Sequence, residues 1–388
     1  MARIAYVDHS FHRITKSSMF LSDMLRRRGH EVVNYWDDAW QGGNPVEWQE
    51  VQECDVVVML QSYCRRPSSR AFRELHPNVV YIPMLDQFSA WQGPVCNQAA
   101  FWEPFHGSKV LNFSNAVHYL VTNLGIASHW AHYYPEPAPT APTVEGLHGF
   151  FWLRRQNQIN WALIRQLLEK SQFDSFHIHL AVDPISPPPE LPTPDDVERY
   201  RITTSTWFED RKDLTTLLDR ANVYFAPRME EGIGQSFLEA MAQAKCVVAP
   251  NQGTMNEYIV HGLNGLLFDQ QAPQALSFSD ANRLGRNARE SLAIGHLRWL
   301  EAEDSIVDFI LTPSEKLYAG KYQHVFATPD HMRGDARENF SARQTPHLTL
   351  GAALRVLAKQ SKFLQVTRPM WHPLVKLARQ MRAIWRRS

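Results

Sequence analysis

The sequence predicts an α/β protein with two domains, each built on a parallel β-sheet that helices cover on both faces. Short apolar runs rich in valine, isoleucine and aromatic residues alternate with helical patterns along most of the chain, which is typical of parallel sheets. A proline-rich stretch, residues 135–142, can sustain neither helix nor sheet and indicates a stiff linker between the domains. The length of 388 residues fits two or three domains, and the hydrophobic fraction of 44% is ordinary for a globular core.

The first domain is expected to occupy residues 1–143. Apolar runs that end in polar or turn residues predict its strands, and an amphipathic pattern closed by Gly29 predicts a helix. The expected strands are residues 3–8, 31–35, 55–60 and 79–84, and the expected helix is residues 17–28.

The second domain is expected to occupy residues 144–312 and to end in a closing helical region that crosses back to brace the first domain. The same patterns of apolar residues define its elements. The expected strands are residues 149–153, 176–182, 223–227 and 246–250, and the expected helices are residues 159–170, 214–221, 236–244 and 286–309.

The most informative stretch is residues 230–242, in which two glycines join a predicted strand to a predicted helix. Such a unit presents free backbone N–H groups and the positive end of the helix dipole, and its usual ligand is phosphate. Two carboxylates flank the turn, because Glu231 precedes it and Glu239 lies about one turn into the helix. A site for phosphate alone would not need these acids, so they suggest binding of sugar hydroxyls.

Glu231 and Glu239 form an E-x7-E pair, and the stretch from Pro227 to Phe268 resembles the signature of retaining, GT-B-type, family-four glycosyltransferases. The resemblance runs in order through strand, glycine turn, helix, next strand and Asn-Gly turn. It implies the GT-B fold, two Rossmann-like domains facing a cleft, and transfer of a sugar from a nucleotide donor with retention at the anomeric carbon. The alternative is a plain Rossmann-like unit with surface glutamates.

The resemblance also implies roles for single residues. Glu231 is expected to be catalytic, binding hydroxyls of the transferred sugar, and Glu239 is expected to hold the ribose of the nucleotide. Backbone N–H groups of the turn, with an arginine, would stabilise the leaving diphosphate. The donor-binding residues expected in this stretch are Gly232, Ile233, Gly234, Leu238 and Glu239.

The chain departs from the family where cations are expected for the diphosphate. Relatives carry Gly-Arg after the first strand of the second domain and Lys-Gly a few residues on, whereas this chain has Phe151-Trp152 and Asn157 there. A diphosphate bound in a cleft needs a cation to offset its charge. Arg154 and Arg155 are therefore expected to supply it from a shifted register.

The loop after the first strand, residues 9–16, lies at the sheet edge where open α/β sheets bind their ligands. It holds two histidines and two cations, so His9, His12 and Arg13 are expected to contact the acceptor or the donor phosphate. An ordinary solvated loop is the alternative for this segment.

Asp86 follows the strand at residues 79–84 and is expected to bind the acceptor or act as a base in the cleft. Many relatives have a His-Asp pair near this point whose histidine contacts the transferred sugar. This chain has Leu85 at the histidine position. The alternative for Asp86 is a helix-capping or turn role.

A basic tail is expected over residues 313–388. Residues 339–388 carry ten Lys or Arg and no Asp or Glu, although the net charge of the whole chain is zero. Residues 373–387 have one apolar and one basic helical face, and residues 350–364 are similar but less regular. Residues 350–387 are therefore expected to bind an anionic membrane surface. Packing of the tail on the first domain is the alternative; no nucleic-acid motif accompanies the charge, so no nucleic-acid partner is expected.

The remaining features predict a cytoplasmic protein, with peripheral attachment to the inner face of the cytoplasmic membrane as a further expectation from the tail. Four cysteines without CxxC spacing are expected to be free thiols, and neither a signal peptide nor a membrane-spanning segment is expected. No Asp-x-Asp pair is found, so neither a metal nor another cofactor is expected.

The sequence thus predicts a retaining, metal-independent hexosyltransferase that uses a nucleotide sugar. Its acceptor is expected to be a glycan or lipid-linked molecule of lipopolysaccharide, O-antigen or exopolysaccharide synthesis. Two alternatives remain open: a non-catalytic scaffold of GT-B shape recruited by its tail, and a GT-B-shaped epimerase acting on a nucleotide sugar.

Overall fold

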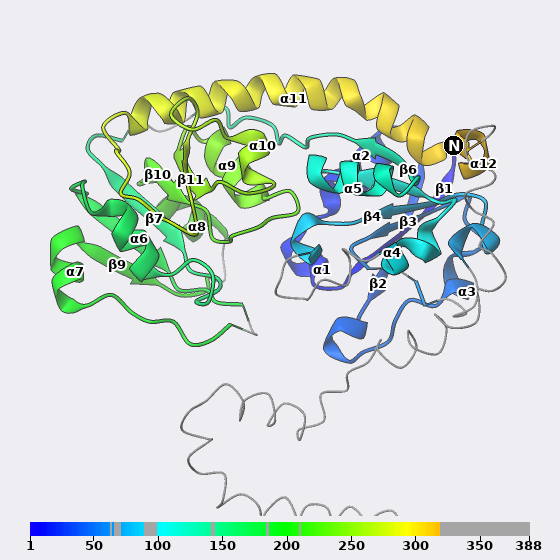
Figure 1. The fold of residues 1–388 in the computed structure, drawn as a ribbon, viewed down its shortest axis with the longest axis horizontal. Coiled ribbons are helices and arrows are strands. Elements are labelled where there is room, and N and C mark those ends of the chain that lie inside the picture. The colour runs from blue at the N-terminus through cyan, green and yellow to red at the C-terminus, as the bar shows by residue number, and fades with distance from the viewer. Residues whose placement is uncertain are drawn as a thin grey trace, which may run out of the picture. The chain divides into compact units, whose positions relative to one another are not determined.

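A computed structural model describes residues 1–318, apart from residue 63 and residues 66–70, 89–98, 141–143, 184–185 and 209–210. Two six-stranded sheets form the framework (Figure 1), and all of their strands pair in parallel. The parallel sheets predicted from the sequence are therefore confirmed. The basic tail, including the proposed membrane-binding residues 350–387, lies outside the described residues.

The first sheet belongs to the part of the chain that we call the first lobe, residues 1–134. Its strand order is β2-β1-β3-β4-β5-β6. The strands are β1 (Arg3–His9), β2 (Glu31–Asp37), β3 (Val56–Leu60), β4 (Val79–Ile82), β5 (Lys109–Asn112) and β6 (Ala127–Trp130). The helices are α1 (His12–Thr15), α2 (Met19–Arg27), α3 (Trp48–Val51), α4 (Ala99–Trp102) and α5 (Asn115–Asn123), with 3-10 turns η1 (Ala39–Gln41), η2 (Phe72–Glu74), η3 (Leu85–Phe88) and η5 (Glu103–Phe105).

The second sheet belongs to the second lobe, residues 144–280, and has the order β12-β11-β10-β7-β8-β9. The strands are β7 (His148–Trp152), β8 (Ser175–His179), β9 (Ile202–Ser205), β10 (Val223–Phe225), β11 (Cys246–Pro250) and β12 (Leu266–Phe268). The helices are α6 (Trp161–Leu168), α7 (Pro194–Tyr200), α8 (Arg211–Asp219), α9 (Gln235–Ala242) and α10 (Met255–Tyr258).

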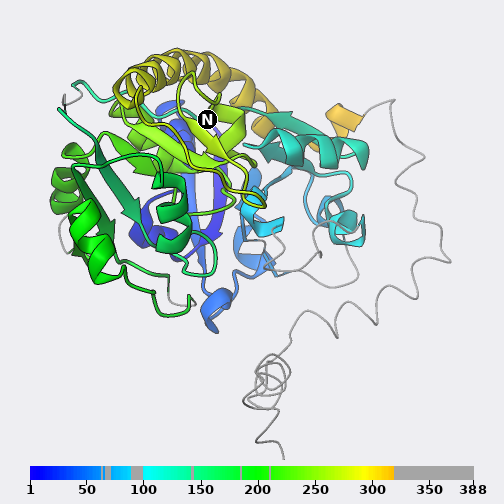
Figure 2. The same ribbon diagram turned by 60° about the vertical axis from the view of Figure 1, so that its left-hand side comes forward.

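A long helix, α11 (Ala281–Leu311), runs from the second lobe to the first and is followed by α12 (Ser314–Tyr318). It packs on α9 and β11 at its start and reaches β3 near its end, and Figures 1 and 2 show it along both lobes. Glu303 on this helix is almost fully buried and pairs with Arg27 and Arg28 of the first lobe at 2.9 and 3.0 Å. The closing helix predicted at residues 286–309 is thus part of α11 and braces the first lobe.

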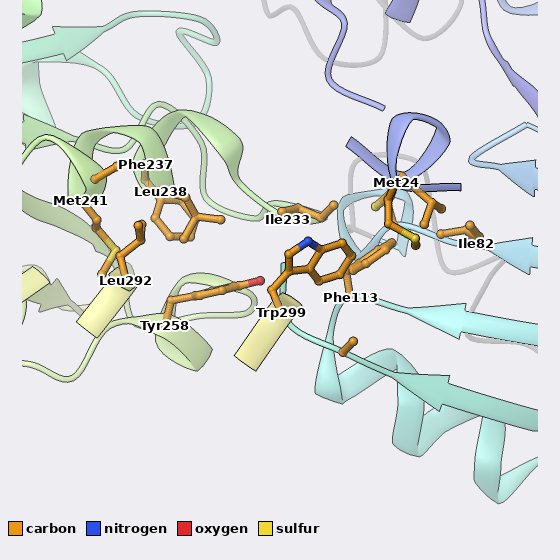
Figure 3. Close-up of a cluster of buried hydrophobic side chains, with 14 of the residues drawn as sticks. Met24, Ile82, Phe113, Ile233, Phe237, Leu238, Met241, Tyr258, Leu292 and Trp299 are labelled. Atoms are coloured by element: carbon orange, nitrogen blue, oxygen red, sulfur yellow. The ribbon is translucent and has the colours of Figure 1, made fainter. Parts of the chain in front are cut away.

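One apolar cluster extends across both lobes (Figure 3). Met24, Ile82 and Phe113 come from the first lobe, Ile233 comes from the glycine turn of the second lobe, and all four are buried. Trp299 of α11 packs against them, with its ring centroid 6.3 Å from that of Phe113. The turn predicted to bind the donor is therefore packed against the first lobe in this structure.

Three cysteines, Cys54, Cys64 and Cys246, are buried free thiols as expected, and Cys96 lies outside the described residues. Within residues 1–318, as far as they are described, no helix is both long and apolar enough to cross a bilayer.

Candidate functional site

The glycine turn connects β10 to α9 at the carboxyl edge of the second sheet. Gly234 caps α9 with a φ of 79°, a left-handed conformation that favours glycine, and a Cβ there would overlap the ring of Phe237. A Cβ on Gly232 would lie 2.7 Å from Cβ of Met84 in the first lobe. Among the described residues, no hydrogen-bond acceptor faces the N–H groups of Gly232, Ile233 and Gly234. They remain able to bind an anion at the N-terminus of the helix.

The two glutamates of the E-x7-E pair differ in exposure. The Glu231 side chain is 12% exposed, and its Oε2 lies 3.6 Å from Nη1 of Arg228. Burial raises the pKa of Glu231; Arg228 opposes this shift, and Asp86 adds to it. Glu239 is exposed on the first turns of α9. One carboxylate is thus enclosed beside a cation, and the other is open to solvent.

Arg154 and Arg155 follow β7, and both bind Asp183 beyond the end of β8. Arg154 donates from Nε and Nη2 to one carboxylate oxygen at 3.0 and 2.8 Å, and Arg155 donates from Nε to the other at 2.9 Å. Burial alone would raise the pKa of Asp183, but its arginine partners outweigh burial and lower it. The two cations expected at the diphosphate are present near the turn, and an internal carboxylate already engages both.

Arg228 is a residue of the site that the sequence analysis did not identify. It lies in the loop between β10 and Glu231, its side chain is 14% exposed, and Nη1 donates to Oδ2 of Asp86 at 2.9 Å. Burial alone would lower the pKa of Arg228, but Glu231, Asp86 and Asp183 outweigh it. Arg228 could have been identified from its position just after a predicted buried strand, because the strands of a parallel sheet end at the ligand-binding edge.

Asp86 lies on η3 in the first lobe, and its carboxylate bonds to Arg228 of the second lobe. The other oxygen, Oδ1, is buried and has no partner among the described residues. Asp86 therefore links the two lobes.

Asp8 near the end of β1 and His12 of α1 form an Asp–His pair. Asp8 is fully buried and accepts hydrogen bonds from His12 Nδ1 at 2.7 Å, from the Ser18 hydroxyl and from the backbone N–H of His9. Because the carboxylate accepts from Nδ1, the lone pair of a neutral His12 ring lies on Nε2. Gln235 at the start of α9 donates to the Ser17 carbonyl at 2.6 Å, which places the loop after β1 beside the glycine turn.

The other residues expected in that loop have different surroundings. The His9 ring stacks on Trp40 with centroids 4.5 Å apart, and burial, with His12 adding to it, lowers the pKa of His9. Arg13 is exposed. Leu238, expected to bind the donor, is fully buried in the core cluster of Figure 3, so packing accounts for its side chain.

Glu257 on α10 makes another contact between the lobes. It accepts from the Ser114 hydroxyl, from the backbone N–H of Asn115 at the start of α5 and from His132, each at 2.9 Å. Burial alone would raise the pKa of Glu257, but these hydrogen bonds outweigh it and lower the pKa. A carboxylate from one lobe thus caps a helix of the other.

An aromatic group lies at the same edge of the second sheet, beyond the ends of β7, β8 and β9. Trp207 is 60% exposed, and its ring centroid is 6.0 Å from that of Trp152. His179 stacks on Phe208 at 5.1 Å with an interplanar angle of 5°. Arg154 lies over the Trp152 ring at 5.2 Å, which joins the aromatic group to the arginines.

A cavity of about 580 Å³ lies elsewhere, at the opposite edge of the second sheet. Its lining includes Gly146, Asp174, Asn222 and the start of α11, and none of the residues discussed above. Within the described part of the chain, no group of three or more His, Cys, Asp or Glu is placed to hold a metal ion. The carboxyl edge of the second sheet, where the arginines, carboxylates and glycine turn meet, remains the candidate site.

Sequence comparison identifies one family in this region. Residues 202–279 match the family described as glycosyl transferases group 1, a segment that contains β9, β10, the glycine turn, α9, β11 and β12. No curated protein sequence matches the chain.

Solved structures share the architecture at low sequence identity. Sucrose-phosphate synthase from Thermosynechococcus elongatus has a TM-score of 0.56 at 12% identity, over 79% of this chain and 99% of that one. The Anabaena protein HepE in complex with UDP and glucose has a TM-score of 0.53 at 14% identity, with the same coverages. The lipopolysaccharide outer core galactosyltransferase WaaB has a TM-score of 0.52 at 12% identity, again over 79% and 99%. With its two parallel sheets, the chain has the GT-B fold that its sequence predicted.

Proposed function

We propose that the protein is a glycosyltransferase that takes a sugar from a nucleotide donor. The observation that carries this proposal is the glycine turn between Glu231 and Glu239, whose N–H groups at the N-terminus of α9 have no partner within the described residues. The match of residues 202–279 to glycosyl transferases group 1 supports it. The HepE complex adds support, because that protein of the same fold was solved with UDP and glucose.

The strand order suggests how a nucleotide sugar would lie. β10, β7, β8 and β9 are consecutive neighbours in the sheet, so the glycine turn, the arginines and the aromatic group follow one another along one edge. The sugar would lie against Glu231 and the diphosphate near the turn and the arginines. The base would reach the aromatic group, and Glu239 would hold the ribose.

The mechanism that we propose is retaining and needs no metal. As the bond to the leaving diphosphate breaks, negative charge grows on the phosphate oxygens, and the N–H groups of the turn together with a guanidinium would stabilise it. Glu231 would bind the sugar and steady the positive charge that develops on its ring. Retention is inferred from the E-x7-E resemblance alone. The two carboxylates would face different parts of one donor, so they would not act as the carboxylate pair of a glycosidase.

We also propose an acceptor in surface-polysaccharide synthesis, either a glycan or a lipid-linked sugar. The structural neighbour WaaB, a lipopolysaccharide outer core galactosyltransferase, supports this class. The basic composition of residues 339–388 supports attachment to an anionic membrane. We propose the cytoplasmic face of a membrane as the place of attachment, because the lipids of that face are anionic.

The test is a screen of the full chain against UDP-, GDP-, ADP-, dTDP- and CMP-sugars. Binding is measured by calorimetry and nucleotide release by a coupled assay. We expect one nucleotide class to bind and its sugar donor to be hydrolysed slowly without an acceptor. Absence of binding to every donor would support the scaffold alternative, and interconversion of sugars without nucleotide release would support the epimerase alternative.

Replacing Trp207 by alanine should weaken binding of that nucleotide about 5- to 150-fold, because stacking of a base on an aromatic ring contributes about 1–3 kcal/mol. Calorimetry with the free nucleotide measures the loss. Trp130, 38% exposed on β6 of the first lobe, provides the control, and Trp130→Ala should leave nucleotide affinity unchanged. Equal affinities for the Trp207 variant and the wild type would remove the aromatic group from the donor site.

A further inference from the structure

Arg228 approaches three carboxylates and forms a short hydrogen bond with only one of them. Nη1 lies 2.9 Å from Asp86 and 3.6 Å from Glu231, and Nη2 lies 3.5 Å from Asp183. The contacts to Glu231 and Asp183 are longer than a charge-assisted hydrogen bond, which measures about 2.7–2.9 Å. The guanidinium is therefore held in place by one short hydrogen bond, and it can still form hydrogen bonds to a ligand.

Further N–H donors of Arg228 lack a close acceptor among the described residues. A guanidinium has about five N–H donors in a fixed fork, and Nε of Arg228 is buried without an acceptor among the described residues. Asp86 Oδ1 and Glu230 Oε2 are likewise buried and unpartnered within that part of the chain. Buried polar atoms without partners are uncommon in folded proteins. Nε of Arg228 is a donor and could bind a phosphate oxygen, whereas the two carboxylate oxygens are acceptors and could bind only hydroxyl or N–H groups of a ligand.

Arg154 and Arg155, the arginines expected from the sequence to bind the diphosphate, already form short hydrogen bonds to a carboxylate. Arg154 uses Nε and Nη2 on Asp183, and Arg155 uses Nε on the same carboxylate. To serve a phosphate with those atoms, each would have to give up a hydrogen bond to a carboxylate. Arg228 would gain bonds there without losing its bond to Asp86.

We propose that Arg228 supplies the guanidinium that binds the diphosphate of the donor, and that Asp86 and Asp183 hold this guanidinium in position. This inference rests on the proposed function, and it assigns the missing cation to a residue just after β10 instead of one after β7. Arg228 stands three residues before Glu231 in the loop that ends in the glycine turn. One short segment would thus provide the cation, the N–H groups and the sugar-binding carboxylate.

The charge of the site requires such a cation. Asp86, Asp183 and Glu231 all lie within 3.6 Å of the Arg228 guanidinium, so a diphosphate at the turn would be repelled by these carboxylates without it. An arginine keeps its charge at any relevant pH, and its planar fork fits two phosphate oxygens at once. The same contacts explain why a buried guanidinium is tolerated before the ligand binds.

The test measures binding of inorganic pyrophosphate to the full chain by calorimetry at pH 7. We expect Arg228→Gln to weaken binding by about tenfold or more, because charge-assisted hydrogen bonds are the strong ones. Arg154→Gln should weaken it less, and Arg298→Gln, an exposed arginine of α11, should not change it. Arg228→Lys, which keeps the charge and loses the fork, should fall between the wild type and Arg228→Gln.

Unchanged pyrophosphate affinity in Arg228→Gln, or no binding by the wild type, would overturn the inference. If circular dichroism shows that Arg228→Gln does not fold, Arg228→Lys tests the inference instead. Wild-type affinity for pyrophosphate in Arg228→Lys would count against a bidentate contact. Failure of the proposed function would give a different result from failure of the Arg228 inference. In that case pyrophosphate would bind in an Arg228-dependent way, while no nucleotide sugar would be bound or turned over.

Discussion

Replacing Glu231 by glutamine is expected to lower sugar transfer, or donor hydrolysis, by a factor on the order of 10²–10³, as loss of one preorganised electrostatic contact does in other enzymes. The substitution keeps the size of the side chain and removes the charge that would steady the sugar ring. The carboxylate is enclosed next to Arg228, where a charge interacts more strongly than in water. Steady-state kinetics with the donor identified in the screen measure the loss in kcat.

Glu239 provides the comparison, because it belongs to the same motif and has a different expected task. Glu239→Gln should raise the Kd for the free nucleotide by about tenfold, the usual effect of losing a charged hydrogen bond, and change kcat much less. Glu290→Gln, at an exposed position of α11, serves as the control for loss of a surface carboxylate. Full turnover in the Glu231 variant would rule out the proposed mechanism, and identical effects at the two glutamates would rule out the division of roles.

The fold could be predicted from the sequence because most of its buried strands are short apolar runs. β3, with the sequence Val-Val-Val-Met-Leu, and β11, with Cys-Val-Val-Ala-Pro, are fully buried, and such apolar runs are typical of parallel strands covered on both faces. β5 was not predicted from its apolar residues, because it begins with Lys109, a charged residue that is buried in the structure. α7 was also missed, although Thr193 and Pro194 form a regular helix start.

The glycine turn and its glutamates could be located from spacing alone, since a turn, a cap and a helix are local features. The partners of the arginines could not. Asp183 lies about thirty residues from Arg154, and Asp86 lies on the other lobe from Arg228. The strand order and the packing of the lobes determine which carboxylate binds which guanidinium. Neither can be predicted from the local sequence. The ion pair between Asp86 and Arg228 could not be predicted from the sequence for the same reason.

A second large effect is expected at Lys109, the buried lysine of β5. Its Nζ donates three hydrogen bonds, to the carbonyls of Phe309 and Ile310 at 2.7 Å and of Thr312 at 2.6 Å. The last carbonyls of a helix have no partner within the helix, so this single ammonium caps the end of α11 on the first sheet. Lys109→Met should lower the free energy of unfolding by about 3–5 kcal/mol, because the buried carbonyls lose their donor. Urea denaturation followed by circular dichroism measures this change.

Lys245 is the matched control for Lys109. It is 2% exposed, and its Nζ has no hydrogen-bond acceptor among the described residues. Lys245→Met removes a buried cation that forms no hydrogen bond, so its stability should equal or exceed that of the wild type by up to about 2 kcal/mol. Similar losses in both methionine variants would show that the three carbonyls are not the reason for the effect at Lys109.

The pH dependence gives an independent check on Lys245. Burial lowers its pKa to about 8, an effect that Asp219 opposes, whereas a lysine in the unfolded chain titrates at about 10.4. Between these values the unfolded state binds the proton and the folded state does not, so stability falls as the pH is lowered through this window. Lys245→Met should reduce that slope, measured as the change in urea midpoint between pH 8 and pH 10. An unchanged slope would mean that Lys245 remains protonated in the folded protein throughout this range, and its buried ammonium would then have to be stabilised by Asp219.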